Sequence, residues 1–280
     1  MKYPRVDNSP IYYDSVKDMY RGCEYLTNQG YVIRVLEYRS KNDVLIEFVG
    51  LNYITTVRMN NIKTGRIAYP FHPNKYGAYF GIGPYTKHDT PKIYNTWYKM
   101  FTRVYNENDL NKRNSSYKGL YICQEWFNYQ AFAEWYINYS NLLNPDFYND
   151  YQIDKDILQW GIEGNHYYSP ETCCLIPSVL NMALSNHNVE RISEPDLPVG
   201  VTDNSGCYKA RRSFSINISM YGESPYLGTF NDPMEAFSVY KFHKEKYIKE
   251  LADYYFNLNC ILKDVYDALY KIEIKPFYNK

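Results

Sequence analysis

The 280-residue sequence lacks several features that would place it in a specialised class. No run of apolar residues is long enough to span a bilayer, and residues 1–4 do not begin the apolar run of a signal peptide. The six cysteines include no CxxC pair, so a conventional zinc site is not spelled out. These absences predict a protein that acts in a cytosol, where its thiols stay reduced and no membrane is its partner.

An excess of charge of one sign is also missing, because 31 Lys and Arg residues balance 31 Asp and Glu residues. A neutral chain counts against a broadly basic surface of the kind that binds nucleic acid. A formal net charge of zero still permits a basic patch that is balanced by acidic residues elsewhere. Tyrosine, by contrast, is abundant, with 34 copies. Tyrosine suits cores, interfaces and base stacking, although an AT-rich genome explains its abundance equally well.

Patterns of strands and helices predict an α+β protein with three domains, over residues 1–88, 89–190 and 203–280. In the first domain, three apolar runs separated by turn residues predict a small antiparallel sheet or partial barrel. These runs cover residues 31–38, 44–49 and 53–57. In the second domain, aromatic residues at helical spacing predict helices, which cover residues 93–105 and 126–139. A polar stretch with prolines, residues 185–203, predicts a linker to the third domain.

The third domain is predicted to be a three-stranded sheet plus a helix. A strand over residues 214–220 alternates between apolar and polar side chains, so one face is buried and the other faces water. Its polar positions are Ser213, Ser215, Asn217 and Ser219. Another strand is expected over residues 225–230, and Asp232 then fits a helix N-cap followed by Pro233. The helix is expected to cover the apolar face of the sheet through Met234, Phe237, Tyr240, Ile248 and Leu251.

Three blocks of the middle segment resemble, in the correct order, the motifs of phage HNH-like endonucleases. The first block comprises Tyr94, Trp97, Met100, Arg103 and Tyr105. The second comprises Tyr117, Gly119, Ile122, Cys123, Trp126, Tyr129 and Phe132. The third comprises Ile153, Asp154, Asp156, Gly164, Asn165, Tyr168, Pro170, Cys173 and Pro177. The resemblance covers about a third of the chain. It implies a ββα-type fold, a phage-type DNA endonuclease that acts in the cytoplasm of the host cell, and double-stranded DNA as its partner.

The resemblance also implies roles for individual residues. Asp154 and Asn181 match the ligands of one divalent metal ion, Mg²⁺ or Mn²⁺, which would offset charge on the scissile phosphate. Thr172 falls at the position of a central Asn that braces the hairpin in this family. Lys155 stands where the general-base histidine is expected, and a protonated ammonium cannot accept a proton. Lys155 could instead bind the phosphate as a point charge.

Two further residues are candidates for the missing base, which gives a predicted catalytic set of Asp154, Lys155, Asp156 and His166. His166 is a possible substitute, although a histidine in such a loop is more often only a surface residue. Asp156 could ligate the metal or act as the base itself. The alternative for Asp154, Lys155 and Asp156 is a solvated cluster of charges.

Cysteines at two stations of the resemblance raise the question of a structural zinc ion. Cys123 and Cys173 match positions where the family carries cysteine, but Val104 replaces another of those positions. A structural zinc site is therefore doubtful. Small buried thiols are the better interpretation.

The last segment resembles the integrase-associated and ethylene-response-factor DNA-binding domain, through residues 206–209, the alternating strand, and residues 226–230 and 235–236. The resemblance implies that the exposed face of the sheet lies in the major groove of DNA. Arginine suits guanine edges and phosphates, and asparagine suits adenine. The predicted DNA-binding residues are Lys209, Arg211, Arg212, Ser213, Ser215, Asn217 and Ser219. The alternative is an ordinary solvated sheet face.

Three functions follow from these patterns. The first is a metal-dependent DNA endonuclease of the HNH family with a degenerate active site. The second is a non-catalytic DNA-binding regulator derived from such a nuclease. The third is a virion or host-takeover interaction protein that keeps the fold, which the neutral charge and the surplus of tyrosine favour. No oligomeric state is indicated.

Overall fold

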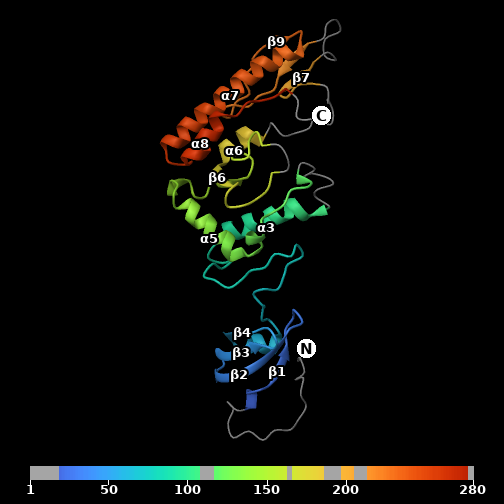
Figure 1. Ribbon diagram of the computed structural model, residues 1–280, viewed down its shortest axis with the longest axis vertical. Coiled ribbons are helices and arrows are strands. Elements are labelled where there is room, and N and C mark those ends of the chain that lie inside the picture. Colours follow the sequence, from blue (N-terminus) through green and yellow to red (C-terminus); the bar gives the residue numbers. More distant parts are fainter. Residues whose placement is uncertain (1–18, 108–116, 163–165, 186–196, 205–212, 277–280) are drawn as a thin grey trace. The chain divides into compact units, whose positions relative to one another are not determined.

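The computed structural model describes residues 19–107, 117–162, 166–185, 197–204 and 213–276. The chain divides into two compact units, residues 1–84 and residues 85–280. The predicted α+β class is confirmed, because the described residues form an antiparallel four-stranded sheet, a two-stranded sheet and a three-stranded sheet, together with helices (Figure 1).

The first unit is an antiparallel meander. Its strands are β1 (Glu24–Leu26), β2 (Val32–Ser40), β3 (Asp43–Phe48) and β4 (Tyr53–Val57), paired in that order, and the short helix α2 (Met59–Thr64) follows. The three predicted strands are confirmed, because alternate apolar residues on β2 and β3 are buried in a common core. The core of these two strands comprises Ile33, Val35, Val44, Ile46 and Phe48. Strand β1 was not predicted, because its three residues are too few to show a period.

The second unit begins with helices that pack through aromatic side chains. They are α3 (Pro91–Tyr105), the 3₁₀ turn η2 (Gln124–Phe127), α5 (Tyr129–Ser140) and the 3₁₀ turn η3 (Pro145–Phe147). Both predicted helices are present, but the second is split at Asn128, whose side chain accepts a hydrogen bond from the Gln130 N–H and caps α5. The buried Trp97 indole joins α3 to η2 by donating to the Trp126 carbonyl at 2.7 Å.

A strand–strand–helix element follows in the chain. Strands β5 (Tyr151–Asp154) and β6 (Cys174–Pro177) are antiparallel, with Asp154 opposite Cys174. Helix α6 (Ser178–Ser185) begins directly after β6, and the Asp150 carboxylate caps it by accepting hydrogen bonds from the backbone N–H and the hydroxyl of Ser178. The order of elements therefore agrees with the predicted ββα arrangement.

The last part of the second unit is a sheet covered by a long helix. The strands are β7 (Val201–Asp203), β8 (Phe214–Ile216) and β9 (Thr229–Phe230), in that order. Helix α7 (Pro233–Asn257) packs against all three, and α8 (Lys263–Tyr270) packs back on α7 (Figure 1). The predicted start of α7 is confirmed, because the Asp232 carboxylate accepts a hydrogen bond from the Met234 N–H at 3.1 Å.

Three expectations for this part were wrong in detail. The strands expected over residues 214–220 and 225–230 shorten to β8 and β9. The stretch expected to be a linker ends in strand β7, because the fully buried Val201 pairs with Ile216. Met234 does not cover the sheet, since its side chain is exposed, whereas the other four apolar residues named for this helix are buried.

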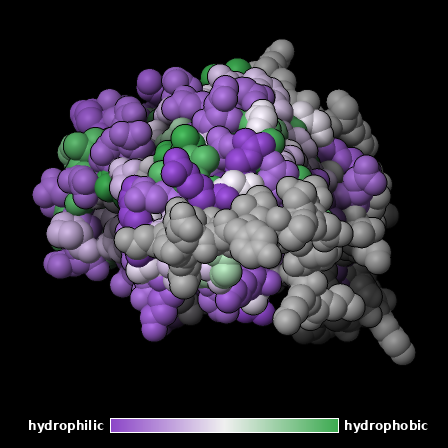
Figure 2. Space-filling view, turned by 90° about the horizontal axis from the view of Figure 1, so that it is seen from below, coloured by the Kyte–Doolittle hydropathy of each residue, from purple (hydrophilic) through white to green (hydrophobic). Residues whose placement is uncertain are grey.

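No helix among the described residues is long and apolar enough to cross a membrane. Large apolar side chains that remain exposed are spread along both units. Figure 2 shows one face, on which hydrophobic residues lie in small groups among hydrophilic ones. Scattered exposed apolar residues of this kind are normal for a protein surface and by themselves mark no binding site.

Candidate active site and nucleic-acid interface

Asp154 ends strand β5 and closes the turn that follows it. One carboxylate oxygen, Oδ1, accepts hydrogen bonds from the backbone N–H groups of Asp156 at 2.8 Å and Ile157 at 2.9 Å. The residue is only 8% exposed. Burial and the neighbouring Asp156 charge together raise the pKa of the Asp154 carboxyl to about 6. Asp154 therefore acts as an internal cap of this turn, in surroundings that disfavour its charged form.

Lys155 is buried as well, although it was expected either in a solvated cluster or at a phosphate. Its ammonium nitrogen lies 2.6 Å from Oδ1 of Asp156, and the rings of Tyr117 and Tyr168 lie 5.3 Å and 5.9 Å from it. The residue is 8% exposed. The alternative of a solvated charge cluster is therefore wrong for Asp154 and Lys155, and the ammonium is directed at Asp156.

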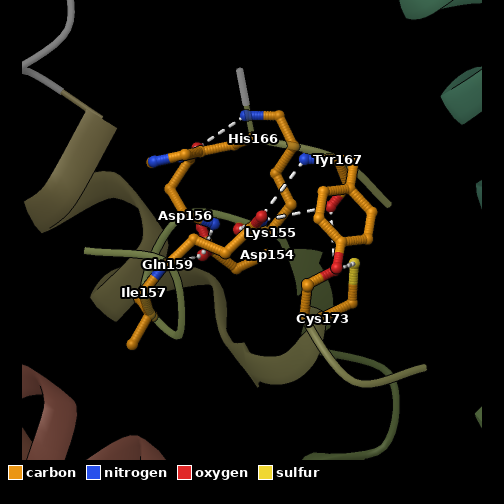
Figure 3. A network of polar contacts seen from close by, with 9 residues as sticks. Asp154, Lys155, Asp156, Ile157, Gln159, His166, Tyr167 and Cys173 are labelled. Atoms are coloured by element: carbon orange, nitrogen blue, oxygen red, sulfur yellow. Dashed lines mark hydrogen bonds and ion pairs between the residues drawn. The ribbon is translucent and has the colours of Figure 1, made fainter. Parts of the chain in front are cut away.

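Asp156 joins Lys155 to His166. The same carboxylate oxygen that contacts Lys155 lies 2.8 Å from Nδ1 of His166 (Figure 3). Burial alone would raise the pKa of Asp156, but the hydrogen bond from His166 and the charge of Lys155 outweigh burial and lower it. An ionised Asp156 accepts the proton of Nδ1, so the other ring nitrogen, Nε2, is the one that can accept a proton. The His166 side chain is 24% exposed, which gives solvent access to the ring.

Two buried polar side chains hold the loop that carries His166. The side chain of Gln159 donates to the Tyr167 carbonyl at 3.1 Å and accepts from the Tyr167 N–H at 3.3 Å. The hydroxyl of Thr172 donates to the same carbonyl at 2.8 Å and accepts from the Ser169 N–H at 3.1 Å. Thr172 thus braces this loop. Gln159 was missed by sequence reasoning, although a lone amide between apolar residues, Ile157 and Trp160 among them, signals a buried hydrogen-bonding role.

The two residues expected to bind a divalent metal ion have different partners. Asn181, on α6, donates from its side-chain amide to Oε1 of Gln152 at 2.7 Å, whereas Oδ1 of Asp154 is engaged by backbone N–H groups. Asp156 already holds the ammonium of Lys155, a positive charge where a cation would have to bind. Within the described ranges, no group of three or more His, Cys, Asp and Glu side chains could hold a metal ion. The residues, as arranged, do not fit Mg²⁺ or Mn²⁺.

The thiols at the predicted family stations are shielded from water. Cys123 is half-buried, and Cys173 and the adjacent Cys174 are buried. Burial raises the pKa of each of these thiols. A raised pKa favours the neutral thiol over the thiolate that binds zinc.

The predicted DNA-reading face is partly described. Asn217 and Ser219 are exposed, and Ser213 and Ser215 are half-buried, while Phe214 and Ile218 point into the core. The predicted alternation is therefore confirmed for Phe214 and Ile218, whereas Ile216 and Met220, which were expected on the same buried face, are only half-buried. Lys209, Arg211 and Arg212 lie outside the described residues.

Sequence reasoning missed a groove between α3 on one side and β5 and α6 on the other. It has a volume of about 580 Å³, and we call it the α3 groove. Its lining from α3 is Lys92, Asn95, Thr96, Lys99 and Arg103. Its opposite wall includes Asp150, Gln152, Ser178 and Asn181. The signal was present in the sequence, because these α3 residues recur at the spacing of one helix face, opposite the buried aromatic face.

Comparisons with known proteins give no identification: no family model, no curated protein and no solved structure matches the chain. The chemistry of the site therefore has to be argued from its own geometry. That geometry offers a histidine oriented by a carboxylate, a buried lysine that fixes the carboxylate, and a groove rich in hydrogen-bond donors.

Proposed function

We propose that the chain is a phage-type DNA-binding protein that hydrolyses phosphodiester bonds at a remodelled HNH-family centre, in the cytoplasm of the host cell. The observation that carries the proposal is the 2.8 Å contact between Nδ1 of His166 and Asp156. Asp156 lies two residues beyond the end of β5, in the strand–strand–helix element where this family holds its general base. His166 thus takes the role that Lys155 cannot perform.

In the proposed reaction, Nε2 of His166 takes a proton from a water molecule whose oxygen attacks the phosphorus atom. The bond from phosphorus to the leaving sugar oxygen breaks, and that oxygen takes a proton from solvent. Asp156 keeps the imidazole in the tautomer with the proton on Nδ1, so that Nε2 is basic. Lys155 is a positioning residue, because it fixes the orientation and the charge of Asp156.

The rate that this centre can reach is limited, because a general base contributes to it but a metal ion does not. A positioned general base contributes roughly 10²- to 10⁴-fold to a reaction rate. The residues do not fit a metal ion, which would stabilise the charge of the transition state by about 3 kcal/mol or more. We therefore expect slow nicking of one strand rather than fast double-strand cleavage.

Nicking of supercoiled plasmids that carry fragments of the genome encoding the chain tests the proposal. The assay is run with EDTA, with Mg²⁺ and with Mn²⁺. His166→Ala should lower the nicking rate about 100-fold or more while DNA binding persists. His88→Ala is the matched control, because His88 also contacts a carboxylate, Asp89, but is 97% exposed. An unchanged rate in His166→Ala would show that His166 is not the base.

A non-catalytic DNA-binding regulator is the second candidate. It is favoured by Asp154 and Asn181, whose side chains serve local structure and do not converge on a common ligand. In that case the wild-type protein would shift DNA in a gel but never nick it, whichever metal ion is added. Failure to bind any DNA at low salt would leave the interaction protein of the virion or of host takeover as the remaining interpretation.

A further inference from the structure

Helix α3 has two chemically distinct faces. The apolar face is buried and comprises Ile93, Trp97, Met100, Phe101 and Val104. The polar face lines the α3 groove and carries Lys92, Asn95, Thr96, Lys99 and Arg103. At 1.5 Å of rise per residue, the row from Lys92 to Arg103 is about 16 Å long. Measured along the axis of a duplex, that length spans about five nucleotide steps at 3.4 Å of rise per step.

The groove carries an excess of positive charge although the chain as a whole is neutral. Its lining contains three cations, Lys92, Lys99 and Arg103, and one carboxylate, Asp150. Both oxygens of that carboxylate are engaged by Ser178, so Asp150 is committed to capping α6. The neutral chain thus gathers local positive charge at this groove, which a polyanion can use.

The three cations are not equivalent. The ammonium of Lys92 donates to the Tyr148 carbonyl and lies 5.0 Å from the ring of Tyr148. Burial lowers the pKa of Lys92, against the opposing effect of Asp150, so this lysine belongs to the floor of the groove. Lys99 is exposed and Arg103 is half-buried. Neither of these two forms an ion pair with any residue that the structure describes.

The opposite wall supplies amide groups. Gln152 is exposed on β5, and its side chain accepts one hydrogen bond from Asn181. Each of these primary amides has two N–H donors, and the hydrogen bond between them uses one of the four. Cations facing amide donors are the lining that suits the oxygens of a phosphate backbone.

Strand β5 connects the groove to the candidate active site. Gln152 and Ile153 of β5 line the groove, and the strand ends at Asp154, two residues before Asp156. Asp156 in turn contacts both Lys155 and His166. The wall of the groove that faces α3 therefore leads directly into the residues that orient His166.

We infer that the α3 groove binds the sugar–phosphate backbone of DNA through Lys99 and Arg103 and directs it toward His166. The inference rests on the proposed function for the identity of the ligand, but it concerns binding and not cleavage. It also moves part of the DNA contact away from the polar face of β8, to a surface that the family resemblance did not indicate.

The test is binding of a fluorescent DNA duplex to the full chain, measured by fluorescence anisotropy at salt concentrations from about 50 to about 300 mM. Over this range the logarithm of the affinity falls linearly with the logarithm of the salt concentration. Lys99→Gln combined with Arg103→Gln should weaken binding about 10-fold and reduce the slope of log Kd against log salt by about two. The matched control is Lys246→Gln combined with Lys263→Gln, which removes two exposed charges from α7 and α8. The control should keep the wild-type slope.

Two outcomes would overturn the inference. The first is an unchanged affinity and slope in the Lys99 and Arg103 double variant, with its thermal midpoint unchanged. The second is displacement of the duplex by inorganic tripolyphosphate at equal phosphate concentration, which would reveal a general anion site. Neither outcome touches the proposed function, because nicking that depends on His166 is measured separately. The inference is supported if tripolyphosphate competes only at large excess and the double variant shows the reduced slope of log Kd against log salt.

Discussion

Asp154 and Asp156 stand two residues apart, and their surroundings move their pKa values in opposite directions. Asp154 meets burial and a like charge, with only backbone N–H groups to offset them. Asp156 meets a lysine and a histidine. Two carboxyls with divergent pKa values mark a site in which each has a separate task. Here one closes a turn and the other orients the ring of His166.

Replacing Asp154 by Asn should stabilise the protein at neutral pH. Because the folded pKa of Asp154 is raised to about 6, its contribution to stability is full below the ordinary pKa and is lost as pH rises through about 6. Asn keeps the oxygen that accepts the two N–H groups but carries no charge. We expect a gain of up to about 3 kcal/mol at pH 7 and none at pH 4.

Urea unfolding of the wild type and of Asp154→Asn, at about four pH values from about 4 to about 7.5, measures this difference in the free energy of unfolding. Asp154→Ala is the control, because it removes the charge and also the acceptor of both hydrogen bonds. It should be less stable than Asp154→Asn at every pH, by about 1–3 kcal/mol. Parallel pH profiles for the wild type and Asp154→Asn would contradict the raised pKa.

Lys155 should be essential for the local structure. Lys155→Met leaves the half-buried Asp156 carboxylate with the hydrogen bond from His166 but without the ammonium that it contacts, and breaking such a pair costs up to about 3 kcal/mol. Lys246→Met removes an exposed lysine that lies 3.8 Å from Glu250, and it should cost less than about 1 kcal/mol. Equal losses in the two variants, by thermal or urea unfolding, would mean that Lys155 does not hold Asp156.

At the scale of elements, the sequence predicted those with a strong local signal. Strands β2 to β4 alternate over several residues, α3 repeats its aromatic face, and α7 begins with a capping Asp and a proline. Strand β7, with three residues, was not predicted, whereas a strand was predicted over residues 225–230 and only the two residues of β9 form it. They exist because Val201 and Phe230 find partners on β8. Such long-range pairing leaves no periodic trace in a short segment.

In the candidate site, too, the residues with a local sequence signal could be predicted and the long-range contacts could not. The charged residues after β5 and the alternative base His166 could be named from their positions in the chain. The contact that makes His166 useful joins residues ten positions apart, and the partner of Asn181 lies 29 positions away. Neither contact has a sequence signal, because the first depends on how the loop after β5 folds back and the second on how α6 packs against β5.

Thr172 should determine the order of that loop. Thr172→Val keeps the shape of the side chain but leaves the Ser169 N–H without the hydroxyl acceptor, at a cost of about 1–3 kcal/mol. Amide hydrogen exchange should rise over residues 166–172. Thr102→Val is the matched control, because the Thr102 hydroxyl donates to the Tyr98 carbonyl within α3. Equal exchange in both variants would show that Thr172 does not brace the loop.

At the scale of the whole molecule, the chain is two compact units, and the proposed chemistry belongs to the second. Helix α7 is part of the reason that residues 85–280 form one unit. It covers the last sheet, and beyond its end Asn259 accepts a hydrogen bond from the Asn144 N–H. The Tyr255 ring of α7 contacts Phe147. The predicted nuclease segment and the predicted DNA-reading segment therefore share a packed boundary.

A fragment comprising residues 85–280 should consequently fold by itself and keep both DNA binding and nicking. Compact units with their own cores usually fold independently. Circular dichroism should show one cooperative thermal transition, and the dissociation constant for duplex DNA should stay within about 3-fold of that of the full chain, less than 1 kcal/mol. A fragment that binds DNA much more weakly would assign part of the DNA contact to residues 1–84.

The central claim is that Asp156 acts through His166 on a DNA phosphodiester. A double-mutant cycle on the nicking rate tests it most directly, with Asp156→Asn, His166→Ala and the two combined. We expect each single variant to lose about 100-fold or more and the combined variant to be no slower than His166→Ala. Losses that multiply in the combined variant, or full activity in either single variant, would show that Asp156 does not act through His166.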